Sequence, residues 1–103
     1  MIATRERLPN RRASETFEIE IASQKYRCSI SHYADGRLAE IFLSNNRMNS
    51  DSDTAARDSA IVCSIALQYG VPVDVIRRAL MRDSSGRPSG PLGHALDLLA
   101  GKP

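Results

Sequence analysis

The chain has 103 residues, of which 42% are hydrophobic, 25% charged and 5% aromatic, so its length fits one domain with a modest core. This composition excludes wholesale disorder. It also argues against a membrane protein, because the longest nearly apolar run, 60–67, is eight residues and a bilayer span needs about 20. No apolar stretch follows the first charged residues, so no signal peptide is visible and we expect a cytoplasmic protein.

The net charge of +2 is unevenly distributed along the chain. Residues 1–12 sum to +3, residues 13–76 to −4 and residues 77–87 to +3. Twelve of the fourteen cationic side chains are arginine, whose guanidinium group matches the geometry of phosphates and carboxylates. Binding of a nucleotide or a nucleic acid is therefore one hypothesis, although only three tyrosines and two phenylalanines are available for stacking on bases.

The chain divides into a short arm and one domain. Residues 1–13 are predicted to be a flexible basic arm, because they are rich in arginine, lack periodicity and contain the breaker Pro9-Asn10. Residues 14–103 are predicted to form a single domain.

Alternating apolar and polar residues predict a first hairpin over 15–30. We expect Ser23 and Gln24 to form its two-residue turn. The expected pairs across the hairpin are Ile21 with Tyr26, Ile19 with Cys28, Phe17 with Ile30 and Glu20 with Arg27.

Asp35 and Gly36 predict a second turn of type I′, which leads into a third strand. The expected pairs are Ile30 with Ile41, Cys28 with Leu43 and His32 with Ala39, so the three strands share one apolar face. The opposite face carries Tyr33, Leu38 and Phe42 beside charged residues. Either the arm or a helix covers this face, or these three residues form an interface with a partner.

A helix is predicted from a cap among Ser50, Ser52 and Asp53 to about Tyr69, where Gly70 stops it. Its second half is apolar nearly all round, which favours a central buried helix lying across the sheet.

Two shorter helices are expected after it. One begins at Pro72 and ends near Asp83, and the other begins at Pro91 and is capped by Gly101. Their apolar stripes are Val75, Ile76, Ala79 and Leu80 in the first, and Leu92, Ala95, Leu96 and Leu99 in the second. The predicted fold is α+β, a three-stranded antiparallel sheet followed by three helices packed on one face.

The sequence offers little for catalysis or metal binding, so we expect no catalytic residue, metal or cofactor. Cys28 and Cys63 lack the spacing of metal-ligand pairs and are expected to be core thiols. His32 is expected to be structural, and His94 to lie on a helix surface.

A candidate anion or partner site lies before the last helix. Ser89 and Gly90 precede a helix start, whose N–H groups attract anions. The arginines near it in sequence are Arg77, Arg78, Arg82 and Arg87. The alternative is that these arginines form a solvated face. In the first case an anion should sit near the N–H groups after Ser89, within reach of Arg87 or Arg82.

Residues 7–100 resemble the TSCPD domain, a small module found at the C-terminal end of many adenosylcobalamin-dependent ribonucleotide reductases and also as a separate protein. The segments that carry the resemblance are Arg7-Leu8-Pro9, Asp35 to Phe42, and Ser64-Ile65-Ala66-Leu67-Gln68-Tyr69-Gly70-Val71-Pro72. The family's Thr-Ser-Cys-Pro-Asp motif is replaced by Pro88-Ser89-Gly90-Pro91-Leu92, so no thiol or metal role of the motif cysteine transfers to this chain.

The resemblance implies a non-catalytic interaction or regulatory module linked to deoxyribonucleotide synthesis, because the family's radical chemistry belongs to a large barrel that does not fit in 103 residues. The expected partner is a ribonucleotide reductase, another nucleotide enzyme, or a second copy of the chain bound through the outer sheet face. The alternative remains a nucleotide or nucleic-acid binding module that uses the arginines.

Overall fold

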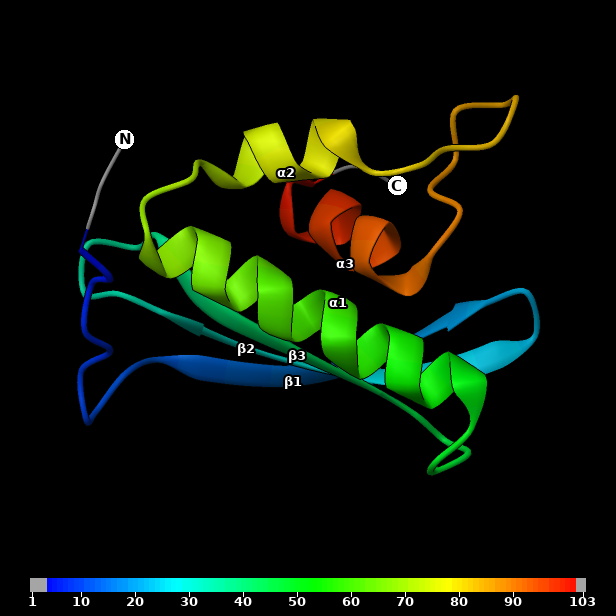
Figure 1. Cartoon of the computed structure of the whole chain (residues 1–103), viewed down its shortest axis with the longest axis horizontal. Helices are drawn as coiled ribbons and strands as arrows, with labels where there is room; N and C mark the ends of the chain where they lie inside the picture. The colour runs from blue at the N-terminus through cyan, green and yellow to red at the C-terminus, as the bar shows by residue number, and fades with distance from the viewer. Residues whose placement is uncertain (1–3, 102–103) are drawn as a thin grey trace.

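The computed structural model describes residues 4–101. Its elements in chain order are β1 (Ser14–Ile21), β2 (Gln24–His32), β3 (Leu38–Asn45), α1 (Asp51–Gln68), α2 (Val73–Ala79) and α3 (Pro91–Leu99). The antiparallel sheet has the order β1-β2-β3, and the three helices lie on one side of it (Figure 1). The predicted α+β fold is therefore confirmed. Residues 1–3 of the predicted arm and 102–103 of the predicted domain lie outside the described residues.

The first hairpin turns one residue earlier than expected. Ala22 and Ser23 are its two turn residues, with φ of 51° and 65°, the left-handed backbone that a type I′ turn requires. Ile21 consequently pairs with Gln24, and the predicted pairs were wrong: Ile19 lies opposite Tyr26, Phe17 opposite Cys28 and Glu18 opposite Arg27. Each residue pairs two positions earlier than predicted, so the same side chains still face the helices.

The second hairpin is partly as predicted. The pairs Ile30 with Ile41 and Cys28 with Leu43 are confirmed, but His32 lies opposite Leu38 instead of Ala39. The N–H of Tyr33 donates to the carbonyl of Arg37, and the N–H of Gly36 donates to the carbonyl of Tyr33. The loop therefore has three residues, 34–36, and of these only Gly36 has positive φ, at 93°. The added loop residue accounts for the register shift next to Ser31.

Helix α1 begins and ends as expected. The Ser50 side chain accepts a hydrogen bond from the N–H of Asp53, and Gly70 follows the helix with φ of 92°. However, the expectation of burial on all sides was wrong, because Val62 is 67% exposed and Ile61 is 49% exposed. α1 packs on β3 while α2 packs on α3, so the outward side of α1 stays uncovered (Figure 1).

Helix α2 ends four residues before the expected Asp83, because the chain becomes extended at Leu80. Beyond it, Asp83 N–H donates to Arg87 O and Ser89 N–H donates to Met81 O, which closes a small hairpin. The predicted stripe was also wrong at Val75, which is 57% exposed, and at Ala79, which is exposed as well, whereas Ile76 and Leu80 are partly buried. In α3 the stripe is buried except for Leu99, and Gly101 has the expected positive φ of 76°.

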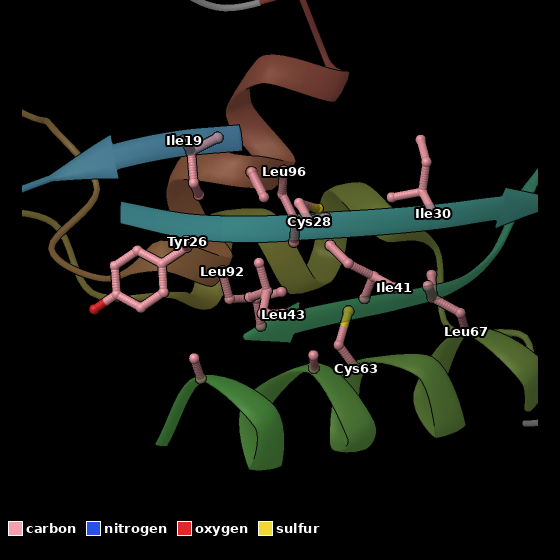
Figure 2. Packing of buried hydrophobic residues seen from close by; sticks show 13 residues of the cluster. Ile19, Tyr26, Cys28, Ile30, Ile41, Leu43, Cys63, Leu67, Leu92 and Leu96 are labelled. Atoms are coloured by element: carbon pink, nitrogen blue, oxygen red, sulfur yellow. The ribbon is translucent and has the colours of Figure 1, made fainter. Parts of the chain in front are cut away.

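The core fills the space between the sheet, α1 and α3 (Figure 2). Its fully covered members include Cys28, Ile41 and Leu96. Cys28 and Cys63 are both buried and unbonded, so the core role predicted for the thiols is confirmed. Burial raises the pKa of Cys28 to about 12 and that of Cys63 to about 11, which keeps both thiols protonated and weakly nucleophilic near neutral pH. Within residues 4–101, no helix combines the length and apolar composition that crossing a bilayer requires.

Ser50→Ala should destabilise the fold by about 1 kcal/mol, because it removes the hydroxyl that satisfies the Asp53 N–H at the start of α1. Urea unfolding followed by circular dichroism measures the loss. Ser50→Asp is the control and should retain most of the stability, since aspartate also caps helices and favours the positive end of the helix dipole. Equal losses in both variants would contradict the capping role.

Candidate functional site

Two of the four candidate arginines are engaged by one buried carboxylate. Arg82 donates to both oxygens of Asp97, at 2.9 Å and 2.7 Å, and Arg77 donates to one of them at 3.3 Å. The hydrogen bonds from Arg82 lower the pKa of Asp97 to about 2, although burial opposes this effect. Arg82 also donates to the carbonyl of Gly86. Arg77 thereby ties α2 to α3, and Arg82 ties the loop after α2 to α3, so both arginines have partners within the fold.

The other predicted residues of this region do not line one common hollow. Arg78 and Arg87 are exposed, and Arg87 lines a hollow with His94 and Asp97. Gly90 lines a different hollow, between α1 and α3. Gly90 caps α3 in place of Ser89, whose N–H bonds to the carbonyl of Met81. Arg82 is thus paired with Asp97, and Arg87 and the first turn of α3 line different hollows, while binding of an anion by these residues stays a prediction.

The N-terminal arm covers one end of the outer sheet face. Arg12 forms an ion pair with Glu40 at 2.6 Å, and both Glu40 and Ser31, a second Arg12 partner, are buried. The Tyr33 hydroxyl donates to the carbonyl of Glu6, whose carboxylate accepts two hydrogen bonds from Arg37 at 3.0 Å. The basic arm thus has acidic and polar partners in the same chain.

The three predicted interface residues have different surroundings. Tyr33 is buried beneath the arm, at 6% exposure. Leu38 is partly buried and packs against the core, because the register shift beside Ser31 changes its place relative to β2. Phe42 alone remains on the surface, at 50% exposure.

Phe42 lies at the edge of a larger apolar surface, which was missed in the sequence. This surface consists of Phe42 on β3 and Ile61, Val62, Ile65 and Tyr69 on α1, each at least 37% exposed; we call it the α1–β3 apolar face. The helical residues share one side of α1, and Ile61 lines a hollow together with Phe42. The all-round apolar run 60–67 was the signal, since a helix on one sheet buries only one side.

Among residues 4–101, no group of three or more His, Cys, Asp or Glu side chains is arranged to hold a metal ion. His32 and His94 are both partly buried and line separate hollows. His94 lies near Glu20, Asp83 and Asp97, of which Asp97 is held by the two arginines.

Comparison with known proteins places these features in a family. The model of the TSCPD domain matches residues 3–100. The chain is 36% identical over 70 residues to the vitamin B12-dependent ribonucleotide reductase of Bradyrhizobium diazoefficiens, 34% over 70 residues to that of Agrobacterium fabrum, and 38% over 72 residues to that of Rhodopirellula baltica.

These matches cover 68–70% of the chain but only 6–7% of each reductase. No solved structure gives a significant match. Since the family model spans nearly the whole chain, including all three strands and all three helices, the chain belongs to the TSCPD domain family.

Proposed function

We propose that this chain is a non-catalytic interaction module that binds a protein partner through the α1–β3 apolar face. The observation that carries the proposal is the exposure of Val62, Ile61 and Phe42 in one region of a small domain. Exposed apolar residues gathered on a folded domain are typical of protein interfaces, whereas scattered ones are ordinary.

The partner that we propose is a ribonucleotide reductase, which links the module to deoxyribonucleotide synthesis. In the matched reductases, the region similar to this chain is 6–7% of a much longer polypeptide. A domain of this kind therefore occurs covalently joined to the enzyme, and a separate copy can recognise the same kind of protein by a non-covalent contact. The arginines give less support to nucleotide binding, because Arg77, Arg82 and Arg12 already pair with carboxylates of the chain.

Val62→Glu should weaken binding to a purified vitamin B12-dependent ribonucleotide reductase from the same source by at least tenfold, because it places a charge in an apolar contact. Biolayer interferometry with the immobilised chain measures the dissociation constant. Val75→Glu is the matched control: Val75 is 57% exposed on α2, outside the α1–β3 apolar face, and its replacement should leave binding unchanged.

Three results would contradict the proposal. Equal weakening by Val62→Glu and Val75→Glu would remove the α1–β3 apolar face from the interface. Failure of the reductase to bind, together with a chain that is monomeric in light scattering, would reject the partner. A dimer that Val62→Glu dissociates would instead assign the face to a second copy of the chain.

A further inference from the structure

A hollow of about 380 Å³ lies at one end of the α1–β3 apolar face, along the edge strand of the sheet; we call it the edge hollow. One wall is the outer face of the sheet, where Phe42 on β3 lies opposite Ser29 on β2, with Arg27 two residues before Ser29 on the same face. Helix α1 forms the other wall with Arg57 and Ile61, which are one turn apart on the same side of the helix.

Asp53 holds the guanidinium group of Arg57 in place at this hollow. The Nε of Arg57 donates to both carboxylate oxygens of Asp53 at 3.0 Å, and Asp53 is only 3% exposed. Among residues 4–101, the two terminal nitrogens of Arg57 have no hydrogen-bond partner, and its side chain is 51% exposed. Arg57 therefore presents two N–H₂ groups to solvent, and ordering them against a ligand costs little side-chain entropy.

Arg27 supplies a second cation at the edge hollow. It is exposed, and its guanidinium group forms no ion pair or hydrogen bond with another side chain of residues 4–101. Glu18 lies opposite Arg27 in the pairing of β1 with β2, but the two side chains do not form an ion pair. Two arginines with unpaired N–H groups at one hollow favour an occupant with negative charge.

The edge hollow also has an apolar wall, which limits the kind of anion that fits. Phe42 is 50% exposed and Ile61 is 49% exposed, and the apolar surface continues along α1 to Val62 and Ile65. A phosphate chain would use the arginines and leave this surface wet, and single-stranded nucleic acids usually stack on several aromatic rings. A protein segment with an apolar and an acidic side chain uses both walls.

We propose that the edge hollow receives an acidic segment of the protein partner, in which an Asp or Glu carboxylate lies next to a large apolar side chain. The carboxylate accepts hydrogen bonds from Arg27 and Arg57, and the apolar side chain packs against Phe42 and Ile61. This inference rests on the proposed function, namely that the α1–β3 apolar face binds a protein, and it adds the chemistry of the partner's contacting segment.

A titration of the ¹⁵N-labelled chain, followed by amide-detected NMR, tests the proposal with two peptides blocked at both ends. Acetyl-Gly-Glu-Phe-Glu-Gly-amide should shift the amide signals of Phe42 and Ile61 saturably. Acetyl-Gly-Gln-Phe-Gln-Gly-amide should bind at least fivefold more weakly, because it has the same shape without the charge. Equal binding of the two peptides, or no saturable shift with the Glu peptide, would overturn the proposal.

Arg27→Gln tests the cation that has no partner in the fold. It should weaken binding of the Glu peptide three- to tenfold and leave binding of the Gln peptide unchanged, since only the charged contact is lost. Arg78→Gln is the matched control: it removes the same charge from an exposed position on α2, and should not change either titration. Unchanged binding of the Glu peptide to Arg27→Gln, or an equal loss in Arg78→Gln, would contradict the proposed contact.

Salt gives a further readout of the charged contact. Raising the NaCl concentration from about 50 to about 500 mM should weaken the Glu peptide at least threefold and leave the Gln peptide unchanged, because exposed ion pairs are screened. A single-stranded oligothymidylate that displaces the Glu peptide and binds more tightly would assign the edge hollow to nucleic acid and overturn the proposal.

Binding of the purified ribonucleotide reductase separates this inference from the proposed function. If Val62→Glu weakens that binding and Arg27→Gln does not, the α1–β3 apolar face is an interface and the acidic segment is rejected. If the Glu peptide binds through Arg27 and the reductase does not bind, the edge hollow is supported and the reductase is rejected as the partner.

Discussion

Ser64→Ala is expected to destabilise the fold by about 2–4 kcal/mol, because two buried backbone groups lose their hydrogen-bond partner at once. The Ser64 hydroxyl oxygen accepts from the N–H of Ile41 at 2.9 Å, and the hydroxyl donates to the carbonyl of the same residue, also at 2.9 Å. Ser64 is 7% exposed and Ile41 is fully buried, so water does not easily replace the hydroxyl.

This contact belongs to a set that protects the edge of the sheet. β3 is an edge strand, and its side away from β2 would otherwise present unpaired backbone groups. α1 satisfies several of them: Gln68 donates to the carbonyl of Ala39, and Asp53 accepts from the N–H of Asn45. Asp53, Ser64 and Gln68 are thus three residues of α1 that form hydrogen bonds with the backbone of β3. Ser64→Ala removes the middle one of these three contacts.

Urea unfolding at pH 7 measures the effect of Ser64→Ala on the free energy of unfolding. Ser59→Ala is the control, because it makes the same change on the same helix, where the Ser59 hydroxyl donates only to the Ala56 carbonyl one turn earlier. We expect Ser59→Ala to change stability by less than about 0.5 kcal/mol. A similar small loss for Ser64→Ala would show that the edge contact contributes little.

The contact between Ser64 and Ile41 also gives a physical reason for part of the resemblance that was found in the sequence. The segment from Ser64 to Pro72 carried the strongest resemblance to the TSCPD domain, and the structure gives two of its residues a physical task, since Ser64 and Gln68 hold the edge strand. Alternation predicted the strands well because their burial follows their repeat, and the cap residues predicted where α1 begins and ends. Neither signal could predict that polar residues of α1 would bond to β3 backbone.

Errors in the fold arose where loop chemistry decided the outcome. Ala22 and Ser23 adopt positive φ without glycine or asparagine, so no residue type marked the first turn. The end of α2 depended on a hairpin between 81–83 and 87–89, which joins residues through backbone bonds rather than through an apolar pattern. Turn and loop residues give weaker signals in the sequence than the alternation of apolar and polar residues, which predicted the side chains that share one face of the sheet.

The candidate sites were harder to predict because charge alone does not show which arginines are paired. The sequence predicted that Arg77 and Arg82 bind an anion, whereas in the structure both arginines form ion pairs with Asp97. The hollow between α1 and α3 is lined by both Tyr26 and Gly90, which lie more than 60 positions apart in the sequence. Only the tertiary packing of β2 against α3 brings such residues to one place.

Asp97→Asn should destabilise the chain by about 1.5–3 kcal/mol at pH 7, since hydrogen bonds to charged groups are worth this much when both partners are partly buried. Asparagine keeps the shape of aspartate but cannot compensate the charges of Arg82 and Arg77, whose side chains are 30% and 13% exposed. Asp58→Asn, a change of an exposed carboxyl on α1, is the control for the loss of one negative charge and should have little effect.

The pH dependence of the difference between wild type and Asp97→Asn identifies the cause. The pKa of Asp97 is about 2 in the folded chain and about 3.9 in an unfolded one, so the unfolded chain takes up the proton first as the pH falls. The stabilising effect of the ionised carboxylate is complete above about pH 5 and is lost progressively between about pH 5 and pH 2.

Thermal unfolding of both chains between pH 7 and pH 2 should therefore show their stabilities converging on the acid side. Wild type will still lose stability from other carboxyls, because hydrogen bonds also lower the pKa values of Asp53 and Asp83. Asp97 contributes one part of the change in the free energy of unfolding with pH, and Asp97→Asn removes that part. A stability difference that stays constant down to pH 2 would show that Asp97 acts by its shape and packing, and the ion pair with Arg82 would then not be what holds the loop after α2 to α3.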